Sequence, residues 1–164
     1  MTANVDTLYR LASTQVRDRQ HDLAATTLSS LLMLAPRHAG ARLLQAGIDL
    51  RQDRYRSAHA QVLAVSAHPP AEATTEYELF QRLRAFNEHA LMIESAQRLL
   101  SLKPLDIGLQ MQVASSLSGI GAPELAVRVW ERMQSREPRH VATLLTEGYL
   151  ATNQGEFDRA ERAL

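Results

Sequence analysis

The sequence predicts an all-α protein, a helical-repeat solenoid built from antiparallel helix pairs, and three observations support this prediction. Prolines recur every 34 residues, at Pro36, Pro70, Pro104 and Pro138. The segment 36–58, PRHAGARLLQAGIDLRQDRYRSA, has a second copy of its pattern at 138–160, three periods later. Small residues also recur at two fixed places within the period. A repeat of this length indicates stacked helix–turn–helix units.

The proline spacing divides the chain into five units of one continuous array. If each proline is the third residue from the end of its unit, a short leader (1–4) is followed by units at 5–38, 39–72, 73–106, 107–140 and 141–164. The fifth unit stops after 24 of its 34 residues. Because proline cannot continue a helix, each one separates a helix pair from the next.

Small side chains at two places predict where the two helices of a unit come closest, since the distance between helix axes depends on the residues at the contact. The eighth place of the unit holds Ala12, Ala46, Phe80, Ala114 and Gly148, and the twentieth holds Ala24, Ala58, Met92, Ala126 and Ala160. Phe80 and Met92 are the large exceptions. We therefore expect the unit 73–106 to be irregular, with helices that splay, slide or shift their turn.

A turn is predicted between these two places. The fifteenth residues of the units are Arg19, Asp53, Asn87, Gly121 and Gly155, and most of them tolerate the left-handed conformation that ends a helix. Pro123 follows near the start of a second helix, where a missing N–H costs little. In the same region His21, Tyr55, His89 and Phe157 share the seventeenth place, where we expect a planar side chain to pack at the turn.

These residues carry a resemblance to the tetratricopeptide repeat family, which covers essentially the whole chain. In the fifth unit the matching residues are Leu144, Gly148, Gly155, Phe157 and Ala160; in the first they are Leu8, Leu11, Ala12, Ala24, Leu28 and Pro36. The second unit departs from the pattern at Gln45 and Asp49, which occupy usually apolar places. The resemblance implies a right-handed solenoid whose first helices line a concave groove.

The composition of the chain indicates which kinds of partner and which cellular compartment to expect. The chain has 18 basic and 18 acidic residues, so we expect neither nucleic acid nor a membrane surface as a partner. Cysteine is absent, and the N-terminus MTANVDTLYR does not resemble a signal peptide. The longest apolar run is too short to cross a bilayer. We expect a cytoplasmic protein.

No pattern in the sequence predicts catalytic, cofactor-binding or metal-binding residues. The six histidines form no ligand motif, and His38 and His140 belong to the two Pro-Arg-His turns. Gly119-Ile120-Gly121 lies between two helices and has Glu124 where a dinucleotide fingerprint needs glycine, so we interpret it as a turn. Trp130, the only tryptophan, falls on an apolar helix stripe and is expected in the core.

By resemblance to the family, five places of each first helix face the groove. They supply Tyr9, Ser13, Arg17, Leu43, Gly47, Arg51, Tyr77, Gln81, Arg84, Met111, Ser115, Leu145, Tyr149 and Asn153. Tyrosine and arginine are favoured anchors in interfaces, although a solvated helix face also needs such residues. Because arginines outnumber acidic residues among these places, we expect an acidic or carboxyl-rich partner.

The leading interpretation of function is a non-catalytic module that holds a peptide or protein in its groove as a scaffold or adaptor. Chaperone-binding members of the family hold the terminal carboxylate of a peptide with a clamp of Lys and Asn side chains. The corresponding places here carry Tyr9 with Ser13 and Leu43 with Gly47, so we do not expect that ligand. A second hypothesis is that the array resembles the front part of a larger bacterial enzyme, such as a sulfotransferase, whose catalytic domain lies beyond residue 164. A third is a structural spacer or oligomerisation arm.

The last unit predicts an uncovered C-terminal edge. Ala160, Ala163 and Leu164 begin an apolar stripe that nothing after it covers. Solenoids need a terminal element with a polar outer face. We therefore expect an N-terminal fragment of a longer protein, whose last helix frays or self-associates through this edge with another copy of the chain.

Overall fold

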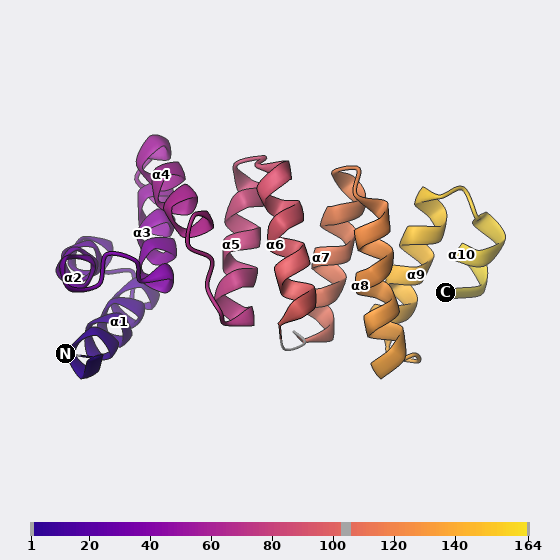
Figure 1. The fold of residues 1–164 in the computed structure, drawn as a ribbon, viewed down its shortest axis with the longest axis horizontal. Helices are drawn as coiled ribbons and strands as arrows, with labels where there is room; N and C mark the ends of the chain where they lie inside the picture. The colour runs from indigo at the N-terminus through magenta and orange to yellow at the C-terminus, as the bar shows by residue number, and fades with distance from the viewer. Residues whose placement is uncertain (1, 103–105, 164) are drawn as a thin grey trace.

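The all-helical architecture is confirmed over the described part of the chain. The structure, a computed structural model, describes residues 2–102 and 106–163, so Pro104 of the proline series and Leu164 of the expected C-terminal stripe lie outside the described residues. Figure 1 shows helix pairs that follow one another along the long axis, with the two chain ends at opposite ends of the array. This arrangement is the predicted helical-repeat solenoid.

The helices occur as consecutive antiparallel pairs. In chain order they are α1 (Thr2–Arg17) with α2 (His21–Leu34), α3 (Ala39–Arg51) with α4 (Tyr55–Ser66), α5 (Ala73–Ala85) with α6 (His89–Ser101), α7 (Ile107–Gly119) with α8 (Pro123–Arg136), and α9 (Val141–Asn153) with the short α10 (Phe157–Ala163). As predicted, α8 begins at Pro123. Helix α1 begins three residues before the first unit counted from the prolines.

The turn within each pair has the predicted left-handed residue. All five fifteenth places have positive φ: Arg19 at 62°, Asp53 at 57°, Asn87 at 57°, Gly121 at 79° and Gly155 at 76°. A single residue of this kind reverses the helix direction and lets the next helix start within a few residues. The left-handed conformation thus extends to Arg19, whose side chain does not favour it.

The seventeenth place is different from the prediction. It is the first residue of each second helix, and its side chain points mostly into solvent: Tyr55 is 59% and Phe157 is 68% exposed. Tyr55 still reaches the turn, since its hydroxyl lies 3.2 Å from Oδ1 of Asp53. The expected contact with the turn is therefore seen for Tyr55, whereas the exposure of Phe157 shows that its ring is mostly free of such packing.

The two Pro-Arg-His segments cap the helices that follow them. Nδ1 of His38 accepts a hydrogen bond from the backbone N–H of Ala41 at 3.1 Å, and Nδ1 of His140 accepts one from Ala142 at 3.1 Å. The first N–H groups of a helix have no partner within the helix, so this bond stabilises its start. Both histidines therefore have a structural role.

The core follows the small residues of each pair. Ala12 and Ala24 are fully buried in the first pair, as are Ala46 and Ala58 in the second, and Ala114 and Ala126 in the fourth. Within the part of the chain that the structure describes, buried apolar side chains form two clusters, a small one around α1 and α2 and a large one from α3 onward, with α3 contributing to both. Trp130 lies in the large cluster, as predicted.

The third pair accommodates its large residues inside the core. Phe80 and Met92 are fully buried, and α5 and α6 contact each other less closely than the helices of the other full pairs do. Bulky side chains at the two contact places are the physical reason, because they hold the helix axes apart. The turn itself is not shifted, since Asn87 keeps the left-handed place of the other units, so the looser contact between α5 and α6 is the only sign of the expected irregularity in the described residues.

The second pair buries polar groups where the family pattern has apolar ones. The carboxylate of Asp49, which is 1% exposed, accepts hydrogen bonds from Ser57 Oγ at 2.6 Å, Gln45 Nε2 at 2.9 Å and Arg54 Nε at 3.1 Å. Burial raises the pKa of Asp49, but these hydrogen bonds and the Arg54 charge outweigh it and lower the pKa below its usual value. The departure from the pattern is thus a satisfied polar cluster.

The C-terminal stripe was predicted wrongly. Ala160 and Ala163 are buried, because the short α10 packs this side against α9. The exposed apolar residues of the C-terminal edge are instead Val141, Leu145 and Tyr149 on α9, with Phe157 at the start of α10. The small residues of α10 therefore form its contact with α9, and they do not form the exposed apolar surface that the sequence predicted.

Candidate functional site

The first helices of the pairs bring most of the predicted groove residues onto one surface, which we call the first-helix face. Helix α1 packs beside α3, α3 beside α5, and α7 beside α9. Side chains on neighbouring first helices are also joined: Tyr77 Oη donates to Gln112 Oε1 at 2.6 Å, and Asn153 Nδ2 donates to Ser118 Oγ at 2.9 Å. These bonds connect residues 35 positions apart in the chain.

Exposure of the predicted residues on this face is unequal. Six are exposed: Arg17, Arg51, Arg84, Leu145, Tyr149 and Asn153. Seven are half-buried between helices: Tyr9, Ser13, Gly47, Tyr77, Gln81, Met111 and Ser115. Leu43 lies in the core with 1% of its surface exposed, so its side chain is not available to a partner. The exposed set consists of arginines at α1, α3 and α5, and of Leu145, Tyr149 and Asn153 at α9.

An open hollow of about 560 Å³ lies on the first-helix face near the N-terminus. It is lined by Asp6, Tyr9, His38, Ala39, Gly40, Pro70, Ala71, Glu72, Thr74, Thr75 and Glu78. Three of these residues are carboxylates, and they come from α1, from the connection before α5, and from α5 itself. Among the described residues, the lining contains no lysine or arginine. This part of the face is therefore acidic, although the predicted groove residues are not.

Tyr9 forms one wall of the acidic hollow. Its ring lies 4.8 Å from the His38 ring, centroid to centroid, and packs over Gly40, where an added methyl group would lie 2.6 Å from the Tyr9 hydroxyl oxygen. Burial and then the charge of Glu78 raise the pKa of Tyr9 above its ordinary value. Tyr9 therefore stays neutral and offers a hydroxyl group to the hollow.

Arg82 is a candidate residue that the sequence prediction missed. It is half-buried, and its guanidinium lies over Gly47, where an added methyl group would come within 2.8 Å of Nη2. Burial lowers the pKa of Arg82, the charge of Glu78 raises it, and the charge of Arg51 lowers it. The sequence does show Glu78 four residues before Arg82, a spacing that places opposite charges side by side on a helix. Neither residue stands at one of the places that face the groove in the family, so the prediction did not include them.

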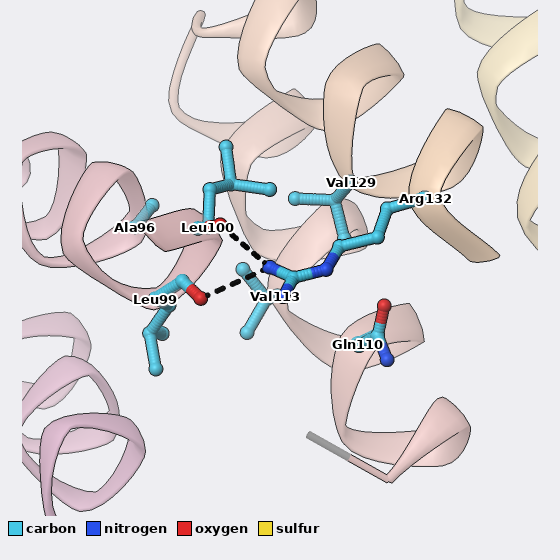
Figure 2. A pocket seen from close by; sticks show the side chains of 7 residues that line it. All are labelled: Ala96, Leu99, Leu100, Gln110, Val113, Val129 and Arg132. Atoms are coloured by element: carbon cyan, nitrogen blue, oxygen red, sulfur yellow. Dashed lines mark hydrogen bonds between the residues drawn. The ribbon is translucent and has the colours of Figure 1, made fainter. Parts of the chain in front are cut away.

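A separate small cavity between α6, α7 and α8 has a structural explanation. It has a volume of about 20 Å³ and is lined by Ala96, Leu99, Leu100, Gln110, Val113, Val129 and Arg132. Figure 2 shows the Arg132 guanidinium directed at the end of α6, where Nη1 donates to the carbonyl oxygens of Leu99 at 3.2 Å and Leu100 at 2.8 Å. The cavity is too small for an organic ligand, and Arg132 instead satisfies carbonyl groups at a helix end.

The described residues contain no group of three or more histidine, cysteine, aspartate or glutamate side chains placed to hold a metal ion. None of the described helices is long and apolar enough to cross a membrane. His59 has a local partner, since its Nε2 lies 2.7 Å from Glu88 Oε1 and its ring stacks on Phe86.

Comparisons with known proteins find similarity in structure alone. No protein-family model matches the chain, and no curated protein matches it. A crystal structure of MamA matches with a TM-score of 0.70 and 15% identity, over 93% of this chain and 89% of that one. YrrB, described as a TPR protein with an unusual peptide-binding site, matches with a TM-score of 0.72 and 15% identity, over 95% and 80% of the two chains.

A third match is a tetratricopeptide repeat protein from Parabacteroides merdae, with a TM-score of 0.73 and 15% identity, over 98% of this chain and 64% of that one. None of the three is described as a sulfotransferase, so the comparisons lend no support to that resemblance. At such low identity the likeness concerns the fold. The chain therefore has the helical-solenoid fold of tetratricopeptide repeat proteins.

Proposed function

We propose that the chain is a protein- or peptide-binding scaffold and that its partner lies on the first-helix face. The observation that carries this proposal is the concentration of charged and aromatic side chains there, beside an open hollow of about 560 Å³. Arginine and tyrosine anchors near a concave surface favour binding of a polypeptide segment. The description of YrrB as a peptide-binding TPR protein supports the same class of ligand for this fold.

The part of the partner that contacts α3 and α5 carries carboxylates in this proposal. Arg51 and Arg84 are both exposed there, and only Arg84 has a side-chain hydrogen bond, a long one of 3.4 Å to Ser116 Oγ, within the described residues. Guanidinium groups bind carboxylates in a bidentate geometry, which gives both attraction and orientation. Neither arginine has to break a strong internal contact before it binds.

A charge-reversal experiment tests the proposal. Short random peptides displayed on phage are selected against the immobilised chain, and the affinity of the enriched peptides is measured by calorimetry. Arg51→Glu with Arg84→Glu should weaken binding by about 1–3 kcal/mol where the contacts exclude water, because like charges then face the peptide. Arg128→Glu, at an exposed position on the second helix α8, is the matched control and should have little effect.

Crosslinking of a selected peptide locates the surface directly. Crosslinks to α1, α3 and α5 are expected. Crosslinks confined to the second helices, or equal losses in the double variant and the control, would show that the first-helix face is not the binding surface.

A further inference from the structure

The first-helix face contains two regions of opposite charge that meet on α5. Glu78 lines the acidic hollow, and Arg82, one turn later on the same helix, lies over Gly47 beside Arg51. Four residues of helix correspond to about 6 Å along the axis. A ligand that crosses this boundary therefore meets a negative and a positive field within a few ångströms.

The two charges at the boundary do not neutralise each other by direct contact. Within the described residues, neither a hydrogen bond nor an ion pair within 4.0 Å joins Glu78 to Arg82, although each shifts the pKa of the other. Arg82 makes no side-chain hydrogen bond to any other described residue either. A half-buried guanidinium without a carboxylate partner gains more from a bound carboxylate than an exposed one does.

The acidic region favours a cation for the opposite reason. Asp6, Glu72 and Glu78 come from three separate segments and converge on one hollow, and Tyr9 and His38 supply an aromatic wall. Carboxylates held around a hollow attract a basic side chain, and an aromatic ring beside them adds a cation–π contribution. A uniformly acidic peptide would be repelled here, just as a uniformly basic one would be repelled by Arg51 and Arg82.

We propose that the first-helix face binds a mixed-charge polypeptide segment, with a lysine or arginine in the hollow at Asp6, Glu72 and Glu78 and an aspartate or glutamate on Arg82 and Arg51. This inference rests on the proposed function and names the chemistry of its partner. In an extended segment, side chains two residues apart lie on the same side, about 6.6 Å from each other, which is close to the separation of about 6 Å between Glu78 and Arg82 along α5. The two charged residues of the partner are therefore two positions apart, and the charge boundary sets the direction of the segment.

The selection of displayed random peptides described above tests this inference with two single variants. Enriched peptides should carry a basic and an acidic residue two positions apart, in one order. Arg82→Gln and Glu78→Gln should each weaken such a peptide about tenfold, equivalent to about 1.4 kcal/mol. The matched controls are Arg128→Gln and Glu131→Gln, which remove exposed charges from α8 and should change the affinity by less than about twofold.

Neutralising one charged residue of the peptide at a time shows which of them contacts Arg82 and which contacts Glu78. When the acidic residue of a selected peptide is replaced by its amide, the peptide should become insensitive to Arg82→Gln and stay sensitive to Glu78→Gln. Replacement of the basic residue by glutamine should give the reverse result. Thermal unfolding of both variants checks that the fold is retained.

The possible outcomes separate this inference from the proposed function. Enriched peptides of a single charge sign, or peptides whose affinity does not depend on Glu78 and Arg82, would overturn the mixed-charge inference and leave peptide binding intact. A selection that enriches no peptide above a support without protein would overturn both. Enriched mixed-charge peptides with the two assigned sensitivities would support both.

Discussion

At the scale of single residues, each helix pair turns on one residue in the left-handed conformation, and the residues at these places tolerate it unequally. Gly121 and Gly155 adopt a positive φ without steric cost, and Asp53 and Asn87 adopt it more readily than most side chains do. Arg19, with φ of 62°, has no such advantage. The first turn therefore contains local backbone strain that the other turns lack.

Replacing this arginine should stabilise the protein. We expect Arg19→Gly to raise the free energy of unfolding by about 0.5–1 kcal/mol, because relief of left-handed strain of about 1–2 kcal/mol exceeds the extra entropy of glycine in the unfolded chain. The measurement is urea unfolding followed by circular dichroism. Arg10→Gly, at an exposed position within α1, is the control and should lower stability by about 1 kcal/mol. A loss of stability in Arg19→Gly would contradict the strain argument.

The buried Asp49 cluster predicts a pH dependence. The pKa of Asp49 is lower in the folded protein than its ordinary value of 3.8, so the carboxylate stabilises the fold above pH 3.8. This contribution is lost as the pH falls through the lowered folded pKa, because the folded state then has to take up a proton that the unfolded state already carries. Acid should therefore weaken the second pair.

The test compares the wild-type chain with Asp49→Asn across this pH range. The difference in unfolding free energy between the two proteins should shrink as the pH falls below about 3.8. The raised pKa of Glu78 has the opposite effect on stability, but it is present in both proteins and cancels in the difference. A difference that stays constant from neutral pH to acid would show that Asp49 does not titrate in this way.

At the scale of helices, the separation of each pair depends on the side chains at the eighth and twentieth places. Alanine at both places lets α7 and α8 approach closely, whereas Phe80 and Met92 fill the same places between α5 and α6. The alanines of α7 and α8 and the large side chains of α5 and α6 are all fully buried, so neither helix contact leaves room for a larger side chain. The same substitution should consequently have different effects in the two pairs.

A volume change at the twentieth place tests this point. Ala126→Leu should lower the free energy of unfolding by about 1–3 kcal/mol through overpacking, whereas Met92→Leu, which keeps the volume, should cost less than about 1.5 kcal/mol. Thermal and urea unfolding of both variants give the comparison. If Ala126→Leu proved as stable as the parent protein, the fourth pair would have to be less tightly packed than the burial of Ala126 indicates.

At the scale of the whole molecule, the exposed apolar residues of the last pair form the C-terminal edge. Val141 is 67%, Leu145 45% and Tyr149 40% exposed along one side of α9, whereas Ile107, which stands at the place of Val141 in the preceding unit, is buried. Within the array, neighbouring helices cover such places. An apolar edge without a cover favours association with another molecule.

We expect the chain to self-associate through this edge. Light scattering over a concentration series should show an average mass that rises with concentration, and Val141→Gln with Leu145→Gln should reduce the rise. Leu63→Gln, which changes a comparably exposed leucine on α4, is the control. A monomer at all concentrations, with α10 fully protected from hydrogen exchange, would show instead that the last pair is self-sufficient.

The sequence by itself determined the fold class, the turns within the pairs and the place of the tight helix contacts. Prolines and left-handed residues act locally, so their spacing predicts helix ends without any knowledge of neighbours, and small residues at fixed places report the contact inside one pair. Gly121 and Gly155 were predicted in this way, whereas only the 34-residue period placed Arg19 at its turn. The residues expected on the first-helix face came instead from the resemblance to the tetratricopeptide repeat family.

Only the tertiary structure decided what the face contains and how it is charged. Leu43 is buried, Arg82 lies over Gly47 from the next pair, and Asp6 joins Glu78 at one hollow. These contacts depend on how consecutive pairs stack, and a 34-residue period says where a residue stands in its unit without saying which side chain from another unit lies beside it. The charge boundary on α5 therefore became visible only when α1, α3 and α5 were placed together in space.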